Sequence, residues 1–291
     1  MSFVDKITAL LKDSPPEFLF EISEAGIAYV RPGPTRQVGF EPLERDVVSV
    51  SPLRDNVLRP EALHTHITRV IGGETPQKKR RKAVLILPDF ATRVAVLDFD
   101  ALPDGAEERQ QLIRFRMKKS VPFDVEDAAL SYHPQPKAKG FSVVVVAAAL
   151  EIISRYEAPF RAAGLHTGLV TTATVTSVDL EKSPGITLTA KLSGKAITVS
   201  ALKNGVLRLV RSVELPEVNR EEILNVLFPT IAFVEDELSG KHDRLVLCGF
   251  DEHGAADLEA ELGLPVQPMH AKHGTPTPYN AGLLGYLESA A

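Results

Sequence analysis

Residues 109–165 read RQQLIRFRMKKSVPFDVEDAALSYHPQPKAKGFSVVVVAAALEIISRYEAPFRAAGL and begin with a basic helical pattern. Leu112, Ile113 and Met117 recur at helical spacing, which predicts one apolar face. Pro122 ends the helix, because proline has no N–H and disfavours helical backbone in the residue before it. The other side chains leave the helix strongly positive, through Arg109, Arg114, Arg116, Lys118 and Lys119.

The same segment continues with two predicted strands and a second helix. A short strand is expected at 130–133. The apolar run 141–150 is too short to span a membrane and is rich in valine at its start, so it is predicted to be a buried strand that leads into a helix. That helix ends at the sequence Ala-Gly-Leu, residues 163–165. The segment therefore predicts an α-β-β-α module within a larger α/β chain.

This order of elements resembles the PilM family of type IV pilus assembly proteins, which are actin-like ATPases. The resemblance rests on FRMKKSVPFD at 115–124, a strand with Tyr132, the run 143–150, and a helix from Tyr156 that ends in Ala-Gly-Leu. The family's extra subdomain has a helix running into an aromatic Ile-Pro-Phe turn, a strand, and a strand-helix pair with the same ending. The order of elements can be followed from about residue 18 to 287.

The rest of the chain alone indicates only an α/β protein with mixed sheets. Strands are predicted at 18–22, 27–30, 47–50, 83–87, 93–98, 186–192, 196–202, 206–213 and 245–248, and helices at 60–71, after Asn219, at 255–262 and at 281–287. Lys203-Asn204-Gly205 suits a type I′ hairpin, and Pro229 is expected to kink the helix that Asn219 caps.

The resemblance implies an α/β, actin-like (ribonuclease-H-like duplicated) two-lobed fold with an inserted α-β-β-α subdomain. The first lobe is then expected at 1–180, with the inserted subdomain at about 100–165. The second lobe is expected at 181–291, and its C-terminal helix 281–287 is expected to return to the first lobe.

Composition sets outer limits on function. The chain has 291 residues, 44% hydrophobic and 24% charged, which is typical of a globular protein with a sizeable core. Its net charge of −5 argues against nucleic acid as the main partner. A single cysteine, Cys248, excludes an internal disulfide and suits a reducing compartment. With no signal peptide and no apolar run of transmembrane length, a cytoplasmic protein is expected.

Two segments have alternative interpretations. The apolar face of 3–11 could lie on a membrane, but its polar face carries as many acids as bases, so packing against the body is favoured. The five cations of 78–82 could form a patch for nucleic acid or acidic lipid. Since no aromatics are interleaved with them, a solvated loop edge is favoured.

Enzymatic and metal-binding motifs are weak. His64 with His66, and His270 with His273, have spacings seen in metal sites, but no cysteine or acidic cluster accompanies them. Surface histidines and no metal are therefore expected. Asp98 and Asp100 are interpreted as an exposed strand edge rather than an acid/base pair, and neither a nucleophile elbow nor a Walker loop is present.

In actin-like ATPases, two β-hairpins each present an Asp and a Gly to the phosphates and magnesium. Where the family has Asp-Ile-Gly-Thr-Ser in the first hairpin, this chain has Glu21-Ile22-Ser23-Glu24-Ala25. Ser23 replaces the glycine, and Glu24 places a negative charge where the phosphates would lie. Like charges about 4 Å apart, at an effective dielectric constant of about 20, repel by on the order of 4 kcal/mol.

The second hairpin departs from the family pattern as well, and so does the adenosine turn, a Gly-Gly turn that the family places near the adenosine. The family's second Asp-Ile-Gly aligns with Thr189-Ala190-Lys191, so a metal-facing carboxylate is missing. Lys191 or Lys195 could hold an anion, but a solvated lysine is favoured. Gly249 keeps one glycine of the adenosine turn, and Phe250 adds bulk where close approach is needed. The resemblance thus implies a pseudo-ATPase with no cofactor, in which neither ATP nor magnesium binds appreciably.

The resemblance also implies a partner. Proteins of this family bind the cytoplasmic N-terminal tail of the inner-membrane protein PilN beside the inserted subdomain, so membrane contact is expected through the partner. Other pilus assembly components are further candidate partners. The residues expected to border the tail-binding groove are Arg114, Phe115, Lys118, Val121, Pro122 and Phe123, with Phe123 lining an apolar pocket. The alternatives are an active actin-like ATPase with unusual ligands, or the cytoplasmic domain of a GspL-like secretion protein, which the end of the sequence at Ala291 disfavours.

Overall fold

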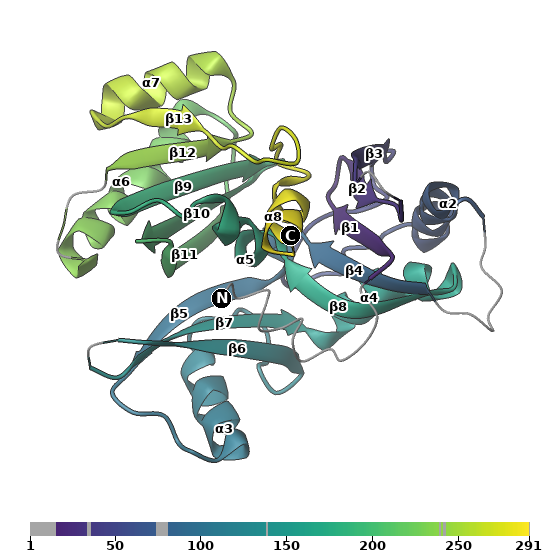
Figure 1. Cartoon of the computed structure of the whole chain (residues 1–291), viewed down its shortest axis with the longest axis horizontal. Coiled ribbons are helices and arrows are strands. Elements are labelled where there is room, and N and C mark those ends of the chain that lie inside the picture. The colour runs from purple at the N-terminus through teal and green to yellow at the C-terminus, as the bar shows by residue number, and fades with distance from the viewer. Residues whose placement is uncertain are drawn as a thin grey trace.

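The computed structural model describes residues 16–33, 36–73, 81–137, 139–238, 240 and 243–290. They form two five-stranded sheets and a three-stranded sheet below them (Figure 1). The predicted N-terminal helix at 3–11 and the first three cations of the run 78–82 lie outside the described residues. None of the helices in the described ranges combines the length and apolarity needed to cross a bilayer.

The first large sheet has the strand order β3-β2-β1-β4-β8. Its elements in chain order are β1 (Phe18–Ile22), β2 (Gly26–Val30), β3 (Val38–Pro42), α2 (Pro60–Ile71), β4 (Arg81–Leu87), α4 (Leu150–Ala162) and β8 (Leu165–Thr172). The first three strands are antiparallel neighbours, whereas β4 runs parallel to both β1 and β8. The central strand β1 is buried along its whole length, as expected for a strand covered on both faces.

The second large sheet repeats this succession, with the order β11-β10-β9-β12-β13. Its elements are β9 (Ile186–Ser193), β10 (Ala196–Lys203), β11 (Val206–Glu214), α6 (Arg220–Leu238), β12 (Arg244–Cys248), α7 (Glu252–Leu262) and β13 (Val266–Pro268). Three antiparallel strands are again followed by a helix, a parallel strand, a helix and a parallel strand. The repeat confirms the predicted two-lobed, ribonuclease-H-like duplication; "first lobe" and "second lobe" denote below the parts built on these two sheets.

Local signals in the second lobe form as predicted. Asn204 and Gly205 both have positive φ, 53° and 73°, as a type I′ hairpin requires. The Asn219 side chain accepts a hydrogen bond from the backbone N–H of Glu222 at 2.9 Å and so caps α6.

The insert is the three-stranded sheet β5-β7-β6 together with α3. Its elements are β5 (Arg93–Phe99), α3 (Ala106–Met117), β6 (Ala128–Pro136) and β7 (Phe141–Ala149). Its core includes Ile113 and Met117 of α3 against Val143 and Val145 of β7. The predicted order α-β-β-α along the chain is therefore present.

The elements that pack together in the insert are not the four that the sequence predicted. Helix α4, predicted to close the module, contributes Ile152, Tyr156 and Phe160 to the core of the first lobe. Strand β5, predicted to precede the module, pairs with β7 inside it. Sequence periodicity gives each element but not which core receives its apolar face.

A second difference concerns the third strand of the first lobe. It is β3, Val38–Pro42, and not the predicted 47–50, where only Val48 forms an isolated bridge, with Val57. Gly39 and Pro42 weaken the strand signal of β3, yet Gly39 is required, since a Cβ there would lie 2.5 Å from the Tyr29 ring.

The C-terminal helix α8 (Ala281–Ser289) packs against the first sheet, although the chain reaches it from the second. Leu283, Tyr286 and Leu287 share an apolar cluster with Leu19 of β1 and Ile86 of β4. Figure 1 shows α8 at the junction of the two lobes.

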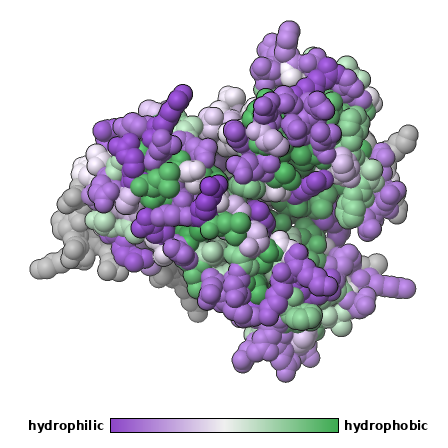
Figure 2. Space-filling model, turned by 180° about the vertical axis from the view of Figure 1, so that it is seen from behind, coloured by the Kyte–Doolittle hydropathy of each residue, from purple (hydrophilic) through white to green (hydrophobic). Residues whose placement is uncertain are grey.

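The insert also touches the second lobe. Val144 of β7 clusters with Leu202 of β10 and Leu207 of β11, and β5 lies beside β11 (Figure 1). In Figure 2, apolar residues gather where the second lobe, at upper right, meets the insert, at lower right. A cavity of about 600 Å³ opens between these parts, lined among others by Phe233 of α6 and Arg208 of β11.

Candidate functional site between the lobes

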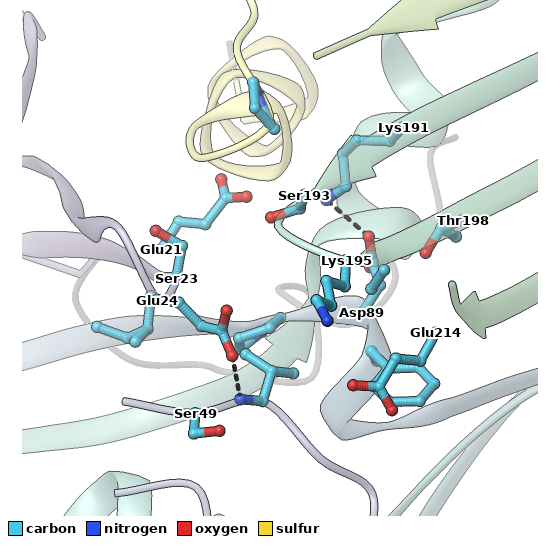
Figure 3. Close-up of a pocket in the computed structure, with 16 residues that line it drawn as sticks. Glu21, Ser23, Glu24, Ser49, Asp89, Lys191, Ser193, Lys195, Thr198 and Glu214 are labelled. Atoms are coloured by element: carbon cyan, nitrogen blue, oxygen red, sulfur yellow. Dashed lines mark hydrogen bonds and ion pairs between the residues drawn. The ribbon is translucent and has the colours of Figure 1, made fainter. Parts of the chain in front are cut away.

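A cavity of about 280 Å³ lies between the two lobes, where the β1–β2 hairpin of the first lobe faces the β9–β10 hairpin of the second (Figure 3). Charged side chains line it from both sides: Glu21, Glu24 and Asp89 from the first lobe, and Lys191, Lys195 and Glu214 from the second. It is the position at which the resemblance places the nucleotide.

The central contact in this cavity is an ion pair between Asp89 and Lys191. Asp89 follows β4, Lys191 lies on β9, and their carboxylate Oδ2 and ammonium Nζ atoms are 2.6 Å apart. Both residues are buried, at 7% and 8% exposure. The other carboxylate oxygen, Oδ1, accepts hydrogen bonds from the Thr172 hydroxyl at 2.8 Å and the Thr174 backbone N–H at 2.6 Å.

These contacts fix the charge of the pair. Burial alone would raise the pKa of Asp89, but Lys191 and the two hydrogen bonds from Thr174 and Thr172 hold that pKa below its ordinary value. Burial likewise opposes the charged form of Lys191, yet Asp89 and Glu21 raise its pKa. Asp89 is therefore a carboxylate and Lys191 an ammonium at neutral pH.

Glu21 is a second buried carboxyl group beside this pair. Its Oε2 accepts a hydrogen bond from the backbone N–H of Leu283, in α8, at 2.7 Å. Burial raises the pKa of Glu21 to about 7, and the opposing attraction of Lys191 only partly offsets this. Near neutral pH this side chain thus exchanges between its charged and neutral forms.

Ser23 and Glu24 hold the tip of the first hairpin. The Ser23 hydroxyl donates to the Gly26 carbonyl at 2.9 Å and accepts from the Gly26 N–H at 3.1 Å, closing the turn. Glu24 accepts the backbone N–H of Val50 at 2.7 Å. A Cβ on Gly194, in the second hairpin, would lie 3.1 Å from the Glu24 carboxylate, so the two hairpin tips meet here.

The remaining nucleotide-facing residues lie on the second lobe. Thr189 is half-buried on β9, on the same face as Lys191. Gly249 has φ of 86°, and a Cβ there would lie 2.3 Å from the Leu192 carbonyl oxygen, so glycine is needed for local packing. Phe250 packs against the core of the second lobe, and it is absent from the cavity lining.

One expectation for this site is wrong and one residue was missed. Lys191 was expected to be solvated, but it is buried and paired with Asp89. Asp89 was not predicted as a site residue. The available signal was its position just after the buried strand β4, since polar residues at the carboxyl ends of parallel strands gather at one edge of a sheet. The exposed Lys195 contacts only the Pro216 carbonyl, at 3.4 Å, among the partners that the structure describes.

The six residues predicted to border a partner groove lie at the C-terminal end of α3. Phe115 is 67% exposed, Lys118 pairs with Glu126 at 3.0 Å, and Pro122 is exposed. The Arg114 guanidinium donates to the carbonyls of Val125 and Ala128 and so braces the turn. Val121 and Phe123 pack against the core of the insert. None of these six residues lines the cavity between the insert and the second lobe.

One histidine differs from the expectation that the histidines lie on the surface. His66 is buried rather than on the surface, and its ring nitrogens lie 2.7 Å from Glu41 and 3.0 Å from Glu44. This contact ties α2 to β3. Within the described ranges, no group of three or more His, Cys, Asp or Glu side chains is arranged to hold a metal ion.

Comparisons with known proteins place the fold. No protein family and no curated protein matches the chain. Among solved structures, a PilM-PilN type IV pilus biogenesis complex is similar with a TM-score of 0.75 at 16% identity, over 94% of this chain and 98% of that one. A protein of unknown function with an actin-like ATPase fold, from Bacteroides thetaiotaomicron, has a TM-score of 0.54 at 14% identity, over 92% and 94% of the two chains.

The cytoplasmic domain of EpsL, an inner-membrane component of the type II secretion system of Vibrio cholerae, is also similar. Its TM-score is 0.51 at 15% identity, and 94% of each chain is covered. Together these similarities show that the chain has the actin-like ATPase fold, as the sequence resemblance implied.

Proposed function

We propose that this protein is a cytoplasmic scaffold of a type IV pilus or type II secretion-like assembly. It binds the cytoplasmic tail of a PilN-like inner-membrane protein and does so without hydrolysing ATP. Other assembly components are further candidate partners, and membrane contact comes through the partner.

The observation that supports the assembly role is the extent of the structural similarity. The chain aligns with nearly the whole length of a protein solved in a pilus biogenesis complex. The alignment therefore includes both lobes and the insert. The similar EpsL domain belongs to a component of a type II secretion system, so an assembly of that kind is the second candidate.

The absence of hydrolysis is supported by the chemistry of the cavity. Up to four carboxylates (Glu21, Glu24, Asp89 and Glu214) line it, against the two ammonium groups of Lys191 and Lys195. A nucleotide brings further negative charge, which magnesium offsets in an ATPase. Here the buried carboxylate of Asp89 is already neutralised by Lys191.

Isothermal titration with ATP and magnesium is therefore expected to show no binding. The dissociation constant should be weaker than about 1 mM, equivalent to a binding free energy of less than about 4 kcal/mol in magnitude. A low-micromolar constant, or measurable turnover, would instead support the active-ATPase alternative.

The tail-binding site is proposed at the C-terminal end of α3. Phe115 offers an exposed aromatic ring there, the exposed Pro122 adds apolar surface, and Lys118 lies at the rim. An extended peptide uses such a surface through apolar anchors, while rim charges act mainly on the association rate. Phe123 was the expected anchor, but its packing against the insert core makes its truncation a change to folding as well.

The variant Phe115→Ala separates binding from folding. It is expected to weaken binding of a fluorescent PilN-type tail peptide by at least tenfold, about 1.4 kcal/mol, because it removes an exposed anchor. The matched control is Phe233→Ala, which truncates a 50% exposed phenylalanine beside the other cavity. Anisotropy measures both affinities, and circular dichroism checks folding. If only the control variant lost binding, the tail-binding site would have to lie at the cavity between the insert and the second lobe.

A further inference from the structure

The Lys191–Asp89 pair joins the two lobes rather than two parts of one. Lys191 comes from β9, the central strand of the second sheet, and Asp89 from the segment after β4 of the first sheet. Asp89 is rigidly held, because Thr172 and Thr174 occupy its other oxygen. Figure 3 shows the lysine side chain reaching across towards the carboxylate.

The surroundings make this contact costly to break. Opening the lobes would leave a carboxylate and an ammonium group, each more than nine-tenths buried, without their partner until water replaced it. One neighbouring contact closes the same seam, since Glu24 lies against Gly194 of the opposite hairpin. Glu21 accepts the N–H of Leu283 from α8, which packs on the first sheet.

We propose that Lys191 is the resident cation of this cavity, held by its ion pair with Asp89 and its attraction to Glu21, and that it fastens the two lobes in the closed arrangement. The lobes then stay closed with no bound ligand. This role is independent of whether the chain binds a pilus membrane protein, because it rests only on contacts within the chain.

The ammonium group suits this role better than a free metal ion. It carries one positive charge on a tethered side chain, so no ligand has to be captured from solution. It also satisfies Asp89 by direct contact at 2.6 Å, while Glu21 keeps its own hydrogen bond to α8. Magnesium prefers six oxygen ligands, several of them water, and the described residues offer no such group of ligands here.

The test measures the distance between the lobes in the whole chain. Spin labels are attached at Arg45→Cys and Asp257→Cys, exposed positions on the first and second lobes, while the native Cys248 is buried. The distance distribution from electron–electron double resonance should be narrow in the otherwise unchanged protein. In the Lys191→Met variant, a population with a longer distance should appear.

Two further variants make the result decisive. Lys195→Met changes a lysine of the same cavity that has no carboxylate partner among the described residues, and it should leave the distribution unchanged. The double variant Lys191→Met with Asp89→Asn removes both charges of the ion pair, so Asp89 is not left as an unpaired carboxylate, and it should open like the single variant. A closed, narrow distribution in the folded double variant would overturn the proposal, even if the single variant failed to fold.

Discussion

Replacement of Asp89 by alanine is expected to lower the free energy of unfolding by about 3–5 kcal/mol. The side chain is buried, accepts hydrogen bonds from Thr172 and Thr174, and pairs with Lys191. Its removal leaves the buried Lys191 ammonium group without its ion-pair partner and with only Glu21 nearby, and this poorly compensated charge accounts for most of the loss.

The control for this prediction is Asp98→Ala. Asp98 also pairs with a lysine, Lys137, at 2.7 Å, but its side chain is 66% exposed. Exposed ion pairs contribute about 0–1 kcal/mol, so a small loss is expected. Urea unfolding followed by circular dichroism gives both values. Similar losses in the two variants would mean that the Asp89 pair is not a buried contact in solution.

Replacement of Glu21 by glutamine is expected to stabilise the protein at pH 8. The folded state holds the pKa of Glu21 at about 7, above the ordinary 4.5, so folded protein binds more protons than unfolded protein between these values. Stability from this group is therefore complete below about pH 4.5 and is lost as the pH rises towards 7. The loss amounts to about 3 kcal/mol, and a neutral amide that still accepts the Leu283 N–H avoids it.

The measurement is the difference in unfolding free energy between the variant and the unchanged protein from pH 4 to pH 8. It should be near zero at pH 4, rise mainly between about pH 4.5 and pH 7, and level off above that. The groups that face Glu21 are Lys191, Asp89 and Cys248, whose thiol pKa is raised to about 12 by burial, so the thiol stays neutral in this range. Glu214→Gln, an exposed carboxylate of the same cavity, should change stability by no more than about 0.5 kcal/mol at any pH. A constant difference across this range would contradict the assignment.

Most elements of this fold were predictable because their patterns are local. The apolar run of β1, the hairpin of β10 and β11 around Asn204-Gly205, and the Asn219 cap of α6 all carry their signals within a few residues. The strand β3 was missed since its Gly39, a weak strand former, is set by packing against the Tyr29 ring of the paired strand β2.

The site was less predictable because it depends on pairing between lobes. Glu21 and Lys191 were identified as positions where the family pattern is lost, but a sequence does not show that Lys191 turns inward to Asp89. The same limit applies to α4: its apolar face is evident in the sequence, yet only the fold shows that it covers the first lobe rather than the insert.

We propose that this actin-like chain acts as an assembly scaffold that needs no nucleotide. The most direct measurement is the affinity of nucleotide-free protein for a fluorescent PilN-type tail peptide, repeated with saturating ATP and magnesium. We expect saturable binding with the same dissociation constant in both conditions, because the lobes are closed by the Lys191–Asp89 pair before any ligand arrives. Binding that appears only with ATP and magnesium, or no binding in either condition, would contradict it.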